Sequence, residues 1–203
     1  MFKKAIFAAA AAALLALGAG GAHAASHAKS CKAAGGPDDI SFDEANKVYQ
    51  CLTEKMYKGY QKGAKRWIPL DYVANYKNWR AASTAPANPG PHTNRFLFTR
   101  VNEIGFDAYT KYAEDVTMPV GTVISKESFT ISKKGKAKPG PLFIMEKVAP
   151  GTSPSTNDWY YMMVSAKGAP VAVNVARDCH ECHSGFDFQD SLGYPVEEVR
   201  LGQ

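Results

Sequence analysis

The sequence predicts an α+β fold, a mostly antiparallel β-sheet with flanking helices. Four runs in the middle and later parts of the chain are rich in aromatic and β-branched residues, which favours strands at 93–101, 120–131, 142–148 and 159–164. The last three runs are joined by short loops rich in lysine, glycine, proline and serine, and such loops favour antiparallel pairing. A long helical pattern precedes the strands instead of alternating with them.

The first long element is expected to be a helix that begins after Ser41. Ser41 and Glu44, three residues apart, form a capping box. The apolar residues that follow recur at helical spacing as far as Gly59. The other expected elements are short helical stretches at 72–79 and 104–112, a Pro-rich loop at 81–91, and at 171–175 either a fifth strand or the lead-in to a C-terminal helix.

The first 24 residues have the features of a secretory signal peptide. Lys3 and Lys4 form a positive region, an apolar run rich in Ala and Leu follows, and Ala22 and Ala24 have the small side chains of a cleavage site. An uncleaved membrane anchor is the alternative, but the apolar run is shorter than the roughly 20 residues that a spanning helix needs. We therefore expect a periplasmic protein, cleaved near Ala24 and Ala25, with no membrane span in the mature chain.

The charge of the chain gives no reason to expect nucleic-acid binding. The formal net charge is +5, and removal of Lys3 and Lys4 with the signal peptide lowers it to +3. No basic stripe with interleaved aromatic residues is present in the sequence. The lysines at 133, 134, 136 and 138 predict an exposed hairpin loop or, alternatively, a docking patch for an acidic redox partner protein.

The four cysteines form two pairs with different expected roles. Cys31 and Cys51 lie outside any metal or cofactor motif, and an oxidising compartment allows such a pair to form a disulfide. It would join the mature N-terminus to the first helix. Two free thiols are the alternative.

The other two cysteines lie in the motif Cys179-His180-Glu181-Cys182-His183, which predicts one covalently bound haem c. The thiols of Cys179 and Cys182 add to the two vinyl groups of the porphyrin, and His183 supplies a nitrogen to the iron. A zinc site would require adjacent ligands to pack awkwardly, and the chain has no second Cys-x-x-Cys to complete it. A thioredoxin-like pair would follow an early strand in a βαβ unit.

Few side chains outside this motif are candidates for the other face of the iron. The remaining histidines are His92, His27 and the signal-peptide histidine, and the candidate methionines are at 118, 145, 162 and 163. Met118 precedes Pro119 and suits a loop ligand, whereas the other three lie in strand-like runs where core packing is common. A five-coordinate iron with an open face is therefore expected, which favours small-ligand chemistry.

Several stretches of the sequence resemble one family of haem proteins. Gly121–Glu127 has the sequence Gly-Thr-Val-Ile-Ser-Lys-Glu, 75–79 has Asn-Tyr-Lys-Asn-Trp, an arginine-containing strand ends in Asn102, and 158–160 has Asp-Trp-Tyr. With the haem motif near the C-terminus of a β-rich chain, these stretches resemble the cytochrome P-460 family, which includes cytochrome c′-beta. The resemblance covers about 69–195. It implies a mostly antiparallel fold, a homodimer and a five-coordinate haem.

The resemblance also implies a role for Lys126. In the hydroxylamine-oxidising members of the family a lysine is covalently joined to the porphyrin, and Lys126 matches that lysine. The cytochrome c′-beta branch lacks the bond and binds nitric oxide in an apolar pocket. Strand alternation places Lys126 on one face with Ile124 and Ser128. A lysine on the solvent face is the alternative.

Two further catalytic candidates follow from the resemblance. Arg100 matches the family's distal arginine, with Arg95 as the alternative under a different alignment. Glu146 is the candidate carboxylate that takes protons from a bound substrate, because such a reaction needs a base. Either side chain could instead be an ordinary surface group. Phenylalanines on the predicted strands could line a dry distal pocket or belong to the core; they are Phe96, Phe98, Phe129 and Phe143.

The sequence therefore predicts three segments and two alternative functions. The segments are a signal peptide at 1–24, an N-terminal extension with one helix at 25–68, and a cytochrome P-460-like haem domain at 69–203. The first function is oxidation of hydroxylamine or nitric oxide, or other handling of small nitrogen oxides, with electrons passed to a redox partner protein. The alternative is a non-enzymatic nitric oxide binding or electron-transfer cytochrome.

Overall fold

The computed structural model describes residues 30–63, 68–88, 90–173 and 176–202. The predicted signal peptide therefore lies outside the described residues. No helix in the described part of the chain is long and apolar enough to cross a membrane.

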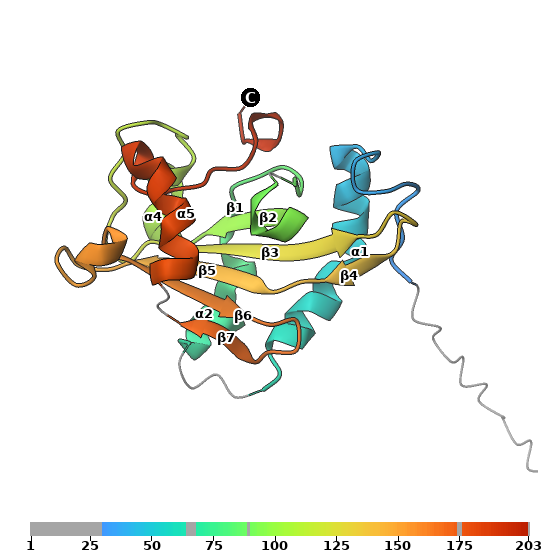
Figure 1. Cartoon of the computed structure of the whole chain (residues 1–203), viewed down its shortest axis with the longest axis horizontal. Coiled ribbons are helices and arrows are strands. Elements are labelled where there is room, and N and C mark those ends of the chain that lie inside the picture. Colours follow the sequence, from blue (N-terminus) through green and yellow to red (C-terminus); the bar gives the residue numbers. More distant parts are fainter. Residues whose placement is uncertain (1–29, 64–67, 89, 174–175, 203) are drawn as a thin grey trace, which may run out of the picture.

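The described residues form an antiparallel seven-stranded sheet, as the sequence predicts (Figure 1). Its main path runs in the order β1-β2-β3-β5-β6-β7, and β4 pairs with the far end of β3. The strands are β1 (Arg80–Ala81), β2 (Phe96–Val101), β3 (Val123–Ile131), β4 (Ala137–Pro139), β5 (Leu142–Lys147), β6 (Trp159–Val164) and β7 (Pro170–Val173).

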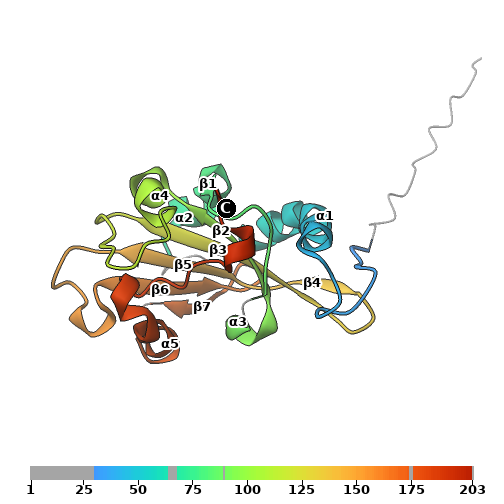
Figure 2. The same ribbon diagram turned by 90° about the horizontal axis from the view of Figure 1, so that it is seen from above.

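Helices cover both faces of this sheet. Figure 2 shows α1 and α2 on one side, and α3 and α5 on the other. The α-helical elements are α1 (Phe42–Tyr60), α2 (Leu70–Asn75), α3 (Pro91–Asn94), α4 (Glu103–Tyr109) and α5 (Glu181–His183). The helix α1 begins where the sequence predicts, because the Ser41 hydroxyl accepts a hydrogen bond from the backbone N–H of Glu44.

The sheet separates two apolar cores, and the alternation of β3 supplies both of them. Val123 and Phe129 point to the α1 side, where they pack with residues of α1 and α2. Ile124 packs on the opposite side, together with Met145 and Trp159. Since side chains alternate along a strand, Lys126 shares the face of Ile124, as the sequence predicts.

Two strands begin later than their residue types predict, for local reasons. β2 begins at Phe96 because His92, Thr93 and Asn94 all have positive φ, a backbone conformation that a strand cannot include. β3 begins at Val123 because the chain turns just before it, at Gly121, whose φ is +86°. Apolar, β-branched composition does not reveal these turns.

The expected disulfide is present between Cys31 and Cys51, whose Cα atoms are 5.7 Å apart. It joins the segment before α1 to the middle of that helix. The same segment pairs with the lysine hairpin, since the Ala33 N–H donates to the Gly135 carbonyl at 2.8 Å. The four lysines of the hairpin are exposed, as expected for this loop.

Replacing Cys31 and Cys51 together by serine should lower the free energy of unfolding by about 3 kcal/mol, because the bridge closes a loop in the unfolded chain. The separation of 20 residues sets the size of that loop. Urea unfolding of the oxidised parent and the double variant measures the difference. Equal midpoints would show that the bridge does not stabilise the fold.

Candidate functional site

The predicted haem motif lies in one continuous helical segment near the end of the chain. This segment comprises the π-helical turn η3 (Ala176–His180), α5, and the 3-10 helix η4 (Ser184–Gln189). Cys179 is half-buried and Cys182 is exposed, and both thiols are free. Cys179 packs at the edge of the core that contains Ile124, and burial raises the pKa of its thiol.

His183 is buried and held in the tautomer that suits a metal ligand. Its Nδ1–H donates to the backbone carbonyl of Ser191 at 2.8 Å, because a carbonyl oxygen can only accept. This leaves Nε2 with a free lone pair, as in most metal-binding histidines. Burial, followed by the charge of Lys126, lowers the pKa of His183 to about 4, so the ring is neutral at ordinary pH.

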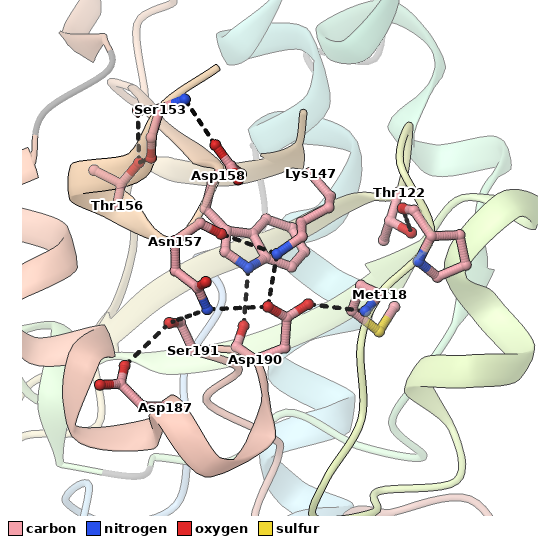
Figure 3. A network of polar contacts seen from close by, with 12 residues as sticks. Met118, Thr122, Lys147, Ser153, Thr156, Asn157, Asp158, Asp187, Asp190 and Ser191 are labelled. Carbon is pink, nitrogen blue, oxygen red and sulfur yellow. Dashed lines mark hydrogen bonds and ion pairs between the residues drawn. The ribbon is translucent and has the colours of Figure 1, made fainter. Parts of the chain in front are cut away.

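The turn that presents the Ser191 carbonyl is fixed by a buried ion pair (Figure 3). Asp190 and Ser191 both have positive φ, 54° and 61°. The Asp190 carboxylate accepts from Lys147 Nζ at 2.6 Å and from Asn157 Nδ2 at 3.1 Å. Lys147 and Asp190 are both buried, at the end of β5 and in the turn after η4.

Two further hydrogen bonds attach the same turn to the rest of the fold. The other carboxylate oxygen of Asp190 accepts from the backbone N–H of Met118 at 2.8 Å. The backbone carbonyl of Asp190 accepts from Trp159 Nε1, also at 2.8 Å. The support of His183 therefore comes from distant parts of the chain, and residue types alone do not reveal it. Met118 itself is a buried core residue.

Lys126 lies on the same side of the sheet as His183. Its Nζ donates to the Gly193 carbonyl at 2.6 Å. A Cβ atom on Gly193 would lie 3.7 Å from Lys126 Nζ and 3.9 Å from His183 Cε1, so this glycine is adjacent to both side chains. Burial lowers the pKa of Lys126 to about 8, so its unprotonated amine is more accessible near neutral pH than that of an ordinary lysine.

His92, in the turn α3, also lies near His183 and Lys126. Its ring stacks on Phe143 with centres 4.6 Å apart, and its centre is 6.2 Å from that of His183. Burial, followed by the charge of Lys126, lowers the pKa of His92 to about 3. The sequence identified His92 only as a remaining histidine, because its position depends on an irregular turn.

A cavity of about 430 Å³ lies beside His92. Its wall combines a cationic side chain with apolar and hydroxyl groups, including Arg95, Phe143, Met163, Ser165 and Val171. Of the phenylalanines considered for a distal pocket, Phe143 lines this cavity. The other three, Phe96, Phe98 and Phe129, belong to the core under α1.

Arg100 and Glu146 lie away from His183, Lys126 and His92. This corrects the expectation drawn from the family resemblance. Thr99 is the residue of β2 that pairs with Lys126, so Arg100 faces the other side of the sheet. There its Nε lies 3.8 Å from the buried carboxylate of Glu127.

The alternation of side chains along β5 also places Glu146 on the face of the sheet opposite Lys126. Phe143 is the residue of β5 that pairs with Lys126, and Glu146 pairs instead with Val123, which faces α1. The arginine on the His183 side is Arg95, the alternative that the second alignment suggests.

The arrangement fits a haem better than the zinc site considered from the sequence. Within the described residues, no three His, Cys, Asp or Glu side chains are grouped to hold a metal ion. A haem attached at Cys179 and Cys182 requires two free thiols three residues apart and a neighbouring imidazole in the ligand tautomer, and all three are present.

Comparison with known proteins identifies the family of this chain. No curated protein matches the chain. A sequence model of the Cytochrome P460 family matches residues 73–192, which is more than half of the chain. The matched region contains Lys126, the Cys179–His183 motif and the turn that supports His183. The chain therefore belongs to the cytochrome P460 family and has the haem cofactor which that membership implies.

Proposed function

We propose that this chain is an exported, periplasmic c-type cytochrome that oxidises or otherwise handles a small nitrogen compound, hydroxylamine or nitric oxide. Cys179 and Cys182 hold one haem covalently, and His183 binds its iron. The observation that carries the proposal is the buried His183 with its Nδ1–H on the Ser191 carbonyl, next to the buried Lys126. Export rests on the sequence of residues 1–24.

The haem supplies an iron that binds the nitrogen of a small molecule and exchanges electrons with an outside partner. The chain itself orients and shields this centre. His183 is held neutral and correctly oriented by the Ser191 carbonyl. Arg95 contributes a positive charge to the adjacent cavity, where it can orient a polar ligand. A redox partner protein and a homodimer, which the family resemblance implies, remain predictions.

Lys126 is the residue proposed to separate this chain from a simple haem carrier. An amine can bond to a porphyrin carbon only when it is unprotonated, and burial makes that form accessible at Lys126. The new bond replaces one N–H bond of the amine and one C–H bond of the porphyrin, so its formation requires a two-electron oxidant such as a peroxide during maturation. Such a bond would distort the macrocycle and change its electronics. The proposal assigns Lys126 this tuning role in hydroxylamine or nitric oxide oxidation.

The alternative is a cytochrome that binds nitric oxide, or transfers electrons, without turnover. The apolar part of the cavity wall favours it, because Phe143, Met163 and Pro141 provide a surface on which a small apolar ligand is well accommodated. In this case Lys126 remains an unmodified side chain bonded to the Gly193 carbonyl.

Proteolysis of the holoprotein should yield a peptide containing Lys126 that is covalently bound to haem. The full chain would be produced in a cell that matures c-type cytochromes, and the haem peptides analysed by mass spectrometry. The peptide containing Lys147, a second buried lysine already paired with Asp190, is an internal control and should carry no haem. A haem-free Lys126 peptide would leave only the binding and electron-transfer alternative. A colourless protein would overturn the proposed function altogether.

A further inference from the structure

We propose that Tyr161 is a redox-active side chain that donates one electron to the haem when a peroxide oxidises it, while its phenol proton passes to His180. The inference goes beyond the handling of nitrogen compounds and rests on the proposed function only for the haem itself. A peroxide is also the class of oxidant that formation of the Lys126 bond requires.

Tyr161 lies on the same side of the sheet as His183 and contacts its ring. It belongs to β6 and pairs with Met145 of β5, which packs in the core that contains Ile124. The side chain is buried, with 2% of its surface exposed. Its ring centre is 5.2 Å from that of His183, at an interplanar angle of 54°. An electron that leaves this ring therefore has a short route to the proposed iron ligand, through a single ring contact.

The hydroxyl group of Tyr161 has a basic partner. It lies 3.1 Å from Nδ1 of His180, which is its hydrogen-bond partner within the described residues. Because buried polar groups are normally paired, the phenol O–H donates and Nδ1 accepts. A phenol is hard to oxidise while it keeps its proton, and an imidazole is the side-chain base that most readily takes up a proton near neutral pH. The pair therefore meets the main requirement of a redox-active tyrosine.

The place of His180 in the chain suits this exchange. It follows Cys179 directly, at a position where the Cys-x-x-Cys-His motif accepts any residue, so haem attachment does not explain a histidine there. Its ring centre is 5.9 Å from that of Tyr161. The side chain is only half-buried, so the ring can pass a proton on to water. His180 therefore connects a buried phenol with the solvent.

Other tyrosines near the sheet are less suited to this role. Tyr112 and Tyr194 donate to backbone carbonyl groups, which are far weaker bases than an imidazole. Tyr49 donates to the buried carboxylate of Glu127, a suitable base, but it packs under α1 on the opposite side of the sheet. Tyr49 is therefore the competing electron donor, and the experiment must distinguish it from Tyr161.

The electrons and protons of the proposed step balance. Reduction of hydrogen peroxide to two molecules of water breaks the O–O bond and consumes two protons from solution and two electrons from the haem. Tyr161 returns one electron: its O–H bond breaks, the proton moves to Nδ1 of His180, and a neutral phenoxyl radical remains beside an imidazolium cation. The redox partner protein returns the second electron. Without that partner, the haem stays one electron more oxidised than its ferric state.

The test is electron paramagnetic resonance of the full-length ferric holoprotein, mixed with hydrogen peroxide and rapidly frozen. The parent protein should give an organic radical signal, and incorporation of ring-deuterated tyrosine should narrow it. Tyr161→Phe keeps the ring and removes only the hydroxyl, so the signal should be lost. Tyr160→Phe changes the next residue of β6, which packs on the opposite side of the sheet, and should keep the signal. His180→Phe keeps a ring but no base, and should slow radical formation about a hundredfold, as loss of a positioned base does.

Spin trapping provides a second measurement that needs no variant. Peroxide treatment of the parent protein with a nitroso trap, followed by mass spectrometry, should place the adduct on Tyr161. Absence of a tyrosyl radical, a signal that survives in Tyr161→Phe but is lost in Tyr49→Phe, or an unchanged rate in His180→Phe would overturn the inference. A holoprotein that forms the radical but binds neither hydroxylamine nor nitric oxide would overturn the proposed function alone. A colourless protein would overturn both.

Discussion

Replacement of both Cys179 and Cys182 by serine is expected to abolish covalent haem attachment completely. A serine hydroxyl lacks the nucleophilic thiolate that adds to a vinyl group. The variant should therefore lose all of its haem when denatured and extracted with acidified organic solvent, whereas the parent protein retains it. Single substitutions should leave one attachment and give intermediate stability of the haem–protein bond.

The matched control for this experiment is the Cys31→Ser, Cys51→Ser pair. It also removes two cysteines, but these form a disulfide between α1 and the segment before it. Figure 1 shows α1 and α5 on different sides of the fold. The control should retain covalent haem despite its lower stability. Equal haem loss from both double variants would indicate a general maturation defect, and retention of covalent haem without Cys179 and Cys182 would contradict the proposed attachment.

Asp190→Ala is expected to lower the free energy of unfolding by about 3–5 kcal/mol, because removal of one partner leaves a buried charge uncompensated. The uncompensated charge is that of Lys147, whose side chain is only 9% exposed. The substitution also removes the acceptor for the Met118 N–H and frees the turn that carries the Ser191 carbonyl. The reduction potential of the haem should therefore shift as well, since the hydrogen bond to His183 changes.

A surface ion pair of the same length provides the control. Lys77 and Glu54 also approach to 2.6 Å, but the Glu54 side chain is 69% exposed. Glu54→Gln should cost far less stability than Asp190→Ala, because an exposed pair is screened by water. Urea unfolding measures both variants, and spectroelectrochemistry measures the potential. A small loss for Asp190→Ala, similar to that of Glu54→Gln, would show that the buried pair does not hold this turn.

A double variant separates the charge effect from the geometric effect. Lys147→Met combined with Asp190→Asn removes both charges and keeps side chains of similar size. Its loss of stability should be smaller than that of Asp190→Ala, because no unpaired charge remains. If the double variant keeps the parental reduction potential, the remaining hydrogen bonds of the turn are sufficient to orient His183.

Local sequence patterns were sufficient for much of the fold. The start of α1 follows from the hydroxyl of Ser41, and the bounds of β6 agree with the predicted strand at 159–164. The shared face of Lys126 and Ile124 follows from the two-residue period of a strand. These features depend on neighbours within a few residues, so a single sequence contains the information that determines them.

The choice among the proposed site residues depended on strand pairing. Arg95 and Arg100 are both near the correct distance from Lys126 in the sequence, but only Arg95 lines the cavity on its side of the sheet. Glu146 was excluded in the same way, because Phe143 is the residue opposite Lys126. A shift of one residue in register reverses the face of every side chain, and residue types alone do not fix that register.

The sequence by itself determined the antiparallel α+β class, the family resemblance and the five-residue motif proposed to bind haem, because each is written in contiguous residues. Only the tertiary structure brought Lys147 to Asp190 and placed His92 beside His183. Those contacts join residues 43 and 91 positions apart, through turns with positive φ that the residue types do not require. Long-range pairing and such turns are decided by the packing of the whole chain, which is why local patterns could not reveal them.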